Sequence, residues 1–232
     1  HKRLSIFIIA TLMIVTIFSN GLAAVAGTWD EVSAGSATGT GIGTSDSGPS
    51  DLMVDSNGQP NVLFNDDTSG NTDLVFRRFD GTNWVSMDGQ SSGDTVNSGV
   101  SNDFTWGGVL TLDDSGNAHV AWDNIVVSPA TESVMYRYWN GSAWVGLGGS
   151  DSGLGILTGV TGLNSGFTLG FTDVEVHPST QHPYIAFNYG TGTTAQVYLR
   201  YWNGSAWDAL GNSSTADQGV SNTPGNFSFA PD

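Results

Sequence analysis

One heptapeptide occurs twice in this chain, and it constrains the fold more than any other feature. Residues 138–144 read Tyr-Trp-Asn-Gly-Ser-Ala-Trp, and residues 201–207 repeat them without change. Residues 78–84 are a looser copy, and a remnant, Gly-Thr-Trp, ends at Trp29. The tryptophans at positions 29, 84, 144 and 207 are 55, 60 and 63 residues apart. This period indicates a repeat protein.

Each repeat contains four segments with the character of short strands. The first three segments are 51–54, 61–64 and 74–79 in the first repeat, 109–112, 119–122 and 134–139 in the second, and 173–176, 184–187 and 197–202 in the third. The fourth begins at Trp84, Trp144 or Trp207, after an Asn-Gly or Asp-Gly step, which is a strong hairpin signal. In the second segments a β-branched residue and an aromatic residue alternate on one strand face, as in Val120 and Trp122.

Four antiparallel strands followed by a long polar connection are typical of a propeller blade. We therefore predict an all-β protein, a β-propeller of four-stranded antiparallel blades at about 49–90, 105–149 and 168–212. Residues 226–232 resemble the start of a further blade, and a strand near 27–33 would complete the last blade and close the ring. Closed propellers have at least four blades, so the prediction is about three blades of a ring of six to eight. The alternative is that three-blade chains assemble into a larger ring.

Residues 1–26 have the features of a secretory signal peptide. A basic start, Lys2-Arg3, precedes 15 apolar residues from Leu4 to Phe18, and Ala24-Val25-Ala26 matches a cleavage site. An uncleaved membrane anchor is the alternative, although a spanning helix usually needs about 20 residues. We expect a mature chain, residues 27–232, that is secreted or at the cell surface and has no membrane contact after cleavage.

The mature chain is strongly acidic. Removing Lys2 and Arg3 leaves four of the six basic residues against all 22 acidic residues, a formal net charge of −18. Such a surface repels nucleic acid and anionic lipid, so neither is expected as a partner. The chain has no cysteine, which excludes disulfides and thiolate metal sites.

The strand and turn patterns of residues 27–232 resemble the repeats of sialidase-like and lectin-like β-propellers of exported bacterial proteins. The resemblance rests on Asp-x-x-Gly-x-x-x-Val-Ala-Trp at 113–122 and on Tyr-Arg-Tyr-Trp-Asn-Gly-Ser-Ala-Trp at 136–144. It implies the propeller fold, and families of this kind include glycosidases, lectins and adhesion modules. The Asp box of true sialidases, Ser-x-Asp-x-Gly-x-x-Trp, is absent here, which argues against sialidase activity.

Six repeated residues are candidates for ligand binding. Arg77, Arg137 and Arg200 occupy one place in three repeats, and sialidases use three arginines to hold a carboxylate. Equivalent residues of different blades lie on a ring and do not converge. We therefore expect each arginine to stack on the aromatic residue two positions later and to pair with an acid of the next blade. The others, Trp84, Trp144 and Trp207, either bind sugar rings or form the core between blades.

Other polar residues carry weaker signals. The Asp-rich turns at 55–58 and 113–116 supply few calcium ligands, so no cofactor is expected beyond adventitious Ca²⁺. His119, His177 and His182 lack zinc spacing. Glu132 is one of three glutamates and follows an expected loop at 124–131. Acids are abundant enough for paired-carboxylate hydrolysis, but no pair is distinguished.

Together these features favour an exported, non-catalytic binding module whose ligand is a carbohydrate or a surface glycan, with further blades as partners. The alternatives are a sialidase-like glycoside hydrolase whose catalytic residues lie partly in other blades, and a structural spacer of a surface protein.

Overall fold

The computed structural model describes residues 30–38, 41–43, 47–67, 72–98, 104–127, 130–158, 172–189, 196–211 and 219–221. The signal peptide and the start of a further blade at 226–232 lie outside these residues and stay predictions. Of the strand predicted near 27–33, residues 27–29 also lie outside, and residues 30–33 are described without strand pairing, so ring closure by this segment stays a prediction. The chain divides into two compact units, His1–Ala34 and Gly35–Asp232, and every described strand belongs to the second. Within the described part, no helix is both long and apolar enough to span a membrane.

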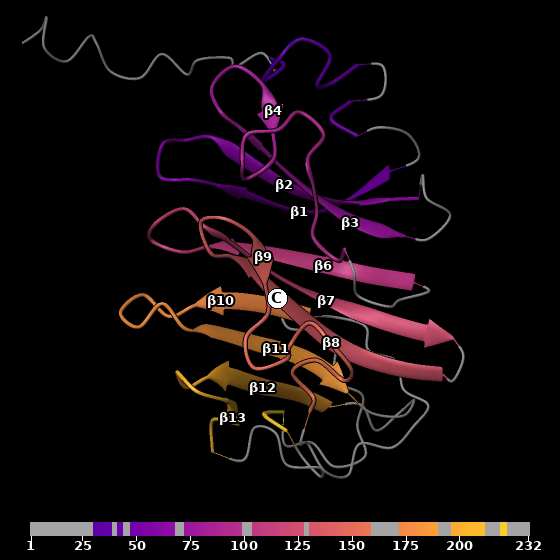
Figure 1. The fold of residues 1–232 in the computed structure, drawn as a ribbon, viewed down its shortest axis with the longest axis vertical. Helices are drawn as coiled ribbons and strands as arrows, with labels where there is room; N and C mark the ends of the chain where they lie inside the picture. The colour runs from indigo at the N-terminus through magenta and orange to yellow at the C-terminus, as the bar shows by residue number, and fades with distance from the viewer. Residues whose placement is uncertain are drawn as a thin grey trace, which may run out of the picture. The chain divides into compact units, whose positions relative to one another are not determined.

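The described strands of the second unit form three antiparallel sheets, each with its strands in chain order (Figure 1). The first sheet is formed by β1 (Ser47–Val54), β2 (Pro60–Asp66), β3 (Asp73–Phe79) and β4 (Trp84–Val85), with β5 (Asp94–Thr95) added beside β3. The second sheet is β6 (Phe104–Leu112), β7 (Ala118–Val127), β8 (Ala130–Trp139) and β9 (Trp144–Val145). The third is β10 (Thr172–Val176), β11 (Pro183–Tyr189), β12 (Gln196–Trp202) and β13 (Trp207–Ala209). The predicted all-β class with four-stranded antiparallel sheets is confirmed, while the propeller and its blade count stay predictions.

The β-branched and aromatic residues that share one face of the second segments lie in the core of the second and third sheets. Val120 and Trp122 of β7 are fully buried, as are Ile185 and Phe187 of β11. Register pairs Val62, Val120 and Ile185 with Arg77, Arg137 and Arg200, so the three repeats correspond residue for residue in this part of the sheet.

The Asn-Gly and Asp-Gly steps form the hairpin between the third and fourth strands. In the loop after β8, the Asn140 side-chain oxygen accepts hydrogen bonds from the backbone N–H groups of Ser142 and Ala143, at 3.0 and 2.9 Å. Asp80 and Asn203 do the same in their loops. The following glycine has a positive φ of 94° at Gly141, which explains why glycine is repeated there.

Two features differ from the sequence-based expectation. Strand β5 lies within the polar connection that follows β4, where no strand is predicted, and it pairs with β3. The expected loop at 124–131 is instead the end of a long hairpin, because β7 runs to Val127 and β8 begins at Ala130. A run of β-branched residues, Ile125-Val126-Val127, favours this strand extension.

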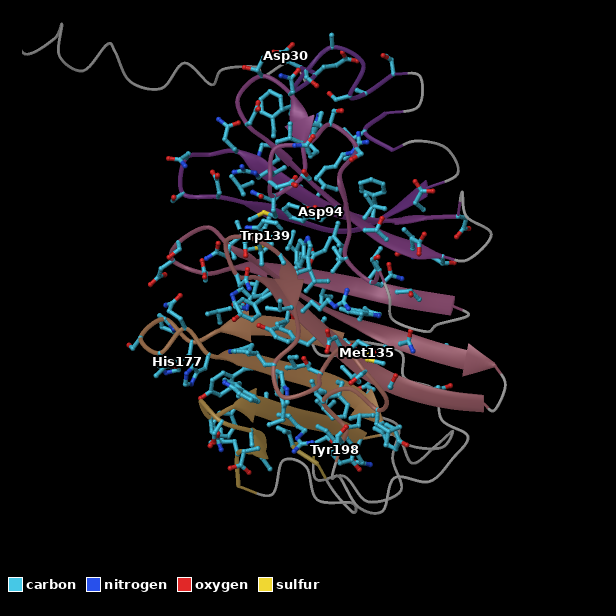
Figure 2. All side chains as sticks on the ribbon, in the orientation of Figure 1. Asp30, Asp94, Met135, Trp139, His177 and Tyr198 are labelled. Atoms are coloured by element: carbon cyan, nitrogen blue, oxygen red, sulfur yellow. The ribbon has the colours of Figure 1, made fainter. Side chains whose placement is uncertain are left out.

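The core consists of two clusters, one on each face of the second sheet. Leu63, Phe76 and Trp122 belong to the cluster between the first and second sheets. Val134, Ile185 and Phe187 belong to the cluster between the second and third sheets. Figure 2 labels one member of each cluster, Met135 and Tyr198.

Close packing between the first two sheets depends on one glycine of β6. A Cβ atom on Gly108 would lie 2.7 Å from the Leu74 side chain and 2.8 Å from that of Leu63. Glycine therefore allows β6 to approach the first sheet without a clash.

Candidate functional site

The three repeated arginines donate hydrogen bonds to backbone carbonyl groups, and they do not converge on one ligand site. Nη1 of Arg77 donates a hydrogen bond to the carbonyl oxygen of Ile42 at 2.8 Å. Nη1 of Arg137 donates one to the carbonyl oxygen of Val96, also at 2.8 Å. Nη1 of Arg200 donates to the carbonyl of Ile156. Each acceptor belongs to the segment that precedes the arginine's own sheet. The arginine thus ties its sheet to the chain segment before it, an arrangement that we call the arginine latch.

Each guanidinium makes further hydrogen bonds. Arg77 also donates to the Ser92 carbonyl at 3.2 Å, Arg137 to that of Ser98 at 2.8 Å, and Arg200 to those of Thr158 and Trp207 at 3.3 and 2.6 Å. Burial lowers the pKa of Arg77 and of Arg200 from the ordinary value. These contacts differ from the expected pairing with an acid of the next blade, because Arg137 pairs with Asp151 of its own repeat at 3.3 Å. The ligand-binding role of these arginines stays a prediction.

Two of the repeated tryptophans pack between neighbouring sheets. Trp144 lies edge-on to Phe76 of the first sheet, with ring centroids 5.6 Å apart. Trp207 makes the equivalent contact with Tyr136 of the second sheet at 5.3 Å, and its Nε1 donates to the Leu147 carbonyl at 2.8 Å. Trp84, in the first sheet, contacts Phe79 of its own hairpin at 5.6 Å. These contacts supply a packing role, and sugar binding by the three tryptophans stays a prediction.

A polar group, of which the sequence singles out only Glu132, lies between the second and third sheets. Thr172 at the start of β10 donates a hydrogen bond from Oγ1 to Oδ1 of Asp123 in β7, at 2.6 Å. Burial raises the pKa of Asp123 to about 7; the Thr172 hydrogen bond opposes this rise, and the charge of Glu132 adds to it. Tyr189 is also buried, and its phenol pKa is raised, first by burial and then by Glu132. We call these four residues, Asp123, Glu132, Thr172 and Tyr189, the polar junction.

Strand register explains why these four side chains face one another. Asp123 pairs with Val134, and Glu132 lies two residues before Val134, so both carboxyl groups lie on one face of the second sheet. That face packs on the third sheet, where Tyr189 belongs to the shared core cluster. The junction therefore adds polar side chains to the shared core cluster of the two sheets.

The polar junction offers specific chemistry. A carboxyl group with a pKa near 7 is partly protonated at neutral pH, so it can donate a proton or a hydrogen bond. Glu132 is only partly buried, so a ligand can approach this second carboxyl group. Two sequence signals point to the site. Glu132 is one of only three glutamates, and Asp123 stands where the neighbouring repeats have Asn65 and Asn188.

A second buried polar group lies in the same sheet. The Tyr136 hydroxyl and Nδ1 of His119 are hydrogen bonded at 2.6 Å, and Nε2 of His119 is 3.7 Å from Oδ2 of Asp113. Burial lowers the pKa of His119 to about 4, although Asp113 opposes this change, so the imidazole is neutral at pH 7. Tyr136 and His119 are buried, and only Asp113 at the end of this chain of side chains is partly exposed. In the described ranges, no three His, Asp or Glu side chains are grouped so as to hold a metal ion.

No protein-family model matches the chain, and no curated protein resembles it in sequence. Solved structures with a similar fold include a protein of unknown function from Dyadobacter fermentans DSM 18053. The two share 11% identity over 69% of this chain and 52% of that one, with a TM-score of 0.46. An N-acetylgalactosamine deacetylase from F. plautii, in complex with blood group B trisaccharide, shares 14% identity over 72% and 53%, with a TM-score of 0.41.

A thermostable family-43 glycoside hydrolase shares 15% identity over 77% of this chain and 60% of its own, with a TM-score of 0.38. The chain thus spans between 52% and 60% of these three proteins. Similarity at this level assigns neither a site nor an activity to the chain.

Proposed function

We propose that this chain is an exported, non-catalytic binding module, secreted or at the cell surface, whose ligand is a carbohydrate or a surface glycan. The polar junction carries this proposal. It combines two carboxyl groups, a hydroxyl group and a phenol ring between two sheets. Binding sites typically place a few polar groups at such interfaces, and groups with strongly shifted pKa values concentrate there.

The chemistry of the junction fits a polyhydroxylated ligand. Carboxylate oxygens accept hydrogen bonds from sugar hydroxyl groups, and aromatic rings pack against the apolar face of a sugar. The acidic surface of the mature chain disfavours anionic ligands, so a neutral glycan is favoured over a phosphorylated or nucleic acid partner. In this proposal Glu132 contacts the ligand, while Asp123 and Thr172 hold the junction together.

We place the binding module in a propeller. The three sheets are then three blades of a ring of six to eight, closed by the strand near 27–33. The arginine latch supports this arrangement, because Ile42 in the segment before the first sheet is held in the same way as Val96 and Ile156 between sheets.

Glycan-array binding by the exported protein, followed by calorimetry on the best ligand, tests the function. Glu132→Gln should lower the affinity for the glycan at least tenfold. The substitution replaces a carboxylate oxygen, which accepts hydrogen bonds from the ligand, by an amide nitrogen, which does not. The matched control is Asp208→Asn, an exposed carboxylate in β13. A protein that binds no glycan, or a Glu132→Gln variant that binds as tightly as the wild type, would overturn the proposal and favour a structural spacer.

The second candidate is a glycoside hydrolase, and the raised pKa of Asp123 beside Glu132 favours it. In such enzymes one carboxylic acid protonates the leaving group, and a second carboxylate acts as a base or nucleophile. The test is hydrolysis of fluorogenic glycosides, sialosides included. If the wild type hydrolyses them and both Asp123→Asn and Glu132→Gln abolish this activity, the protein is a glycoside hydrolase and not a non-catalytic binding module.

A further inference from the structure

The third sheet exposes apolar residues at positions that are buried in the other two repeats. Val220 donates its backbone N–H to the Val197 carbonyl at 2.7 Å, as Val96 does to Leu74 at 2.7 Å and Ile156 to Val134 at 2.9 Å. The three residues are therefore equivalent. Val96 and Ile156 are completely buried, whereas the exposed fraction of Val220 is 57%.

Leu210 is likewise more exposed than the equivalent residues of the other two repeats. It lies three residues after Trp207, as Met87 and Leu147 lie three residues after Trp84 and Trp144. Met87 and Leu147 are partly buried against the core clusters, while Leu210 is 57% exposed. Two further residues of this face, Ala186 and Leu199, are only half-buried, although their equivalents in both other sheets are fully buried. We call Ala186, Leu199, Leu210 and Val220 the tail face.

The arginine latch shows what covers these positions inside the molecule. The carbonyls of Val96 and Ile156 each accept a hydrogen bond from the third-strand arginine of the following sheet. Val220 presents its carbonyl in the same setting. The described arginines, Arg77, Arg78, Arg137 and Arg200, make their hydrogen bonds elsewhere.

We infer that the tail face is a docking surface for one further repeat of the same kind, which places a third-strand arginine on the Val220 carbonyl. The incoming repeat would present apolar residues from its first and second strands, in the manner of Leu110 and Val120 or of Val174 and Ile185. Burying Leu210 and Val220 removes apolar surface from water and so favours docking.

A second copy of this chain is a poorer occupant than a further repeat. Its first sheet does expose apolar residues, since Leu52 and Val54 are 56% and 58% exposed. However, Arg77, which would have to reach Val220, already donates to the carbonyls of Ile42 and Ser92 in its own chain. Docking through this sheet would therefore require the existing latch to open.

The test is an extended chain in which residues 159–221 are duplicated after Asn222. Hydrogen exchange should show at least tenfold greater protection of the amides at 196–211 and 219–221 than in the unextended chain. Matched controls carry Arg200→Ala or Val174→Asp in the appended repeat only, and each should reduce that gain. Unchanged protection at 219–221, or an appended repeat that exchanges like an unfolded chain, would overturn the inference.

Sedimentation of the unextended chain distinguishes the second-copy alternative. Val220→Asp and Leu52→Asp are compared at equal concentration. If the wild type forms oligomers that both substitutions abolish, a second copy occupies the tail face and the inference is wrong. If Leu52→Asp leaves the association state unchanged, a further repeat is supported. Neither readout involves glycan binding, so this test and that of the proposed function can fail separately.

Discussion

At the scale of single residues, the arginine latch makes one guanidinium group the hydrogen-bond donor to several backbone carbonyls. Arg200→Ala removes the donor to the carbonyls of Ile156, Thr158 and Trp207. Leaving the buried Ile156 carbonyl and the two part-buried carbonyls without this donor should lower the free energy of unfolding by about 3 kcal/mol. Arg200→Lys should recover only part of this loss, because an ammonium group lacks the planar fork of donors.

The neighbouring arginine of the first sheet is the control for this prediction. Arg78 donates to the carbonyls of Ser86 and Met87 at 3.4 Å, near the limit of a hydrogen bond, and within its own repeat. Arg78→Ala should therefore cost less than about 1 kcal/mol in urea unfolding. Equal losses in the two alanine variants would contradict the latch.

Asp123 and His119, both buried in the second sheet, give opposite pH dependences of stability. Burial raises the pKa of Asp123 from 3.8 to about 7, so the folded chain binds more protons than the unfolded chain between these values, and stability falls as the pH rises through them. Burial lowers the pKa of His119 from 6.5 to about 4. Its contribution is present above pH 6.5 and is lost as the pH falls towards 4.

Asp123→Asn should therefore change the pH profile of stability. The amide oxygen can still accept the hydrogen bond of Thr172, but the cost of ionising a buried carboxyl group is gone. Relative to the wild type, the variant should gain stability between pH 4 and pH 8, by an amount of the order of 4 kcal/mol. Urea unfolding at pH 4.5, 6.5 and 8 measures this change, with Asp208→Asn as the exposed control. Parallel profiles for the variant and the wild type would show that Asp123 titrates normally.

At the scale of structural elements, the segment that follows β9 depends on one close backbone approach. Gly155 has a φ of 60°, and a Cβ atom there would collide with the carbonyl oxygen of Val134. Gly153 has a φ of 58°, but no atom lies within 4 Å of the position that its Cβ would take. Gly155→Ala should cost several kcal/mol, whereas Gly153→Ala should cost about 1–2 kcal/mol from the left-handed backbone alone. Thermal unfolding of the two variants checks the difference, and similar midpoints would contradict it.

Most of the strands were predictable because local sequence encodes them. Alternation of Val120 and Trp122 marks a strand, and the repeated Asn-Gly step marks the hairpin after β8. Strand β5 was not predictable, because its two residues, Asp94 and Thr95, have polar loop character and pair only through contacts with β3. Local sequence also does not encode where the polar connections between sheets pack against the strands. The carbonyl groups that accept hydrogen bonds from the arginines could therefore not be predicted.

The polar junction shows the same limit at the candidate site. Asp123 and Thr172 are 49 residues apart, and only the packing of the third sheet on the second brings their side chains together. Burial, which shifts the Asp123 pKa, is likewise a property of the assembled sheets. A single sequence offers only the replacement of Asn65 and Asn188 by aspartate at this position, and that difference does not name a partner.

At the scale of the whole second compact unit, equivalent tryptophans occupy two interfaces, of which one holds the proposed site. Trp144 packs on Phe76 between the first and second sheets, and Trp207 packs on Tyr136 between the second and third. Replacing either by alanine should cost about 3–5 kcal/mol. In a stack of repeats such a loss is felt mainly at the affected interface.

The two alanine variants should therefore differ in function more than in stability. Trp144→Ala should speed hydrogen exchange in the first sheet and leave glycan binding intact, because the Asp123–Thr172 contact lies at the other interface. Trp207→Ala should speed exchange in the third sheet and weaken binding, because that sheet supplies Thr172 and Tyr189. If Trp144→Ala kept full stability and abolished binding, the ring would be a ligand platform instead of core, and the binding site would have to move to the repeated tryptophans.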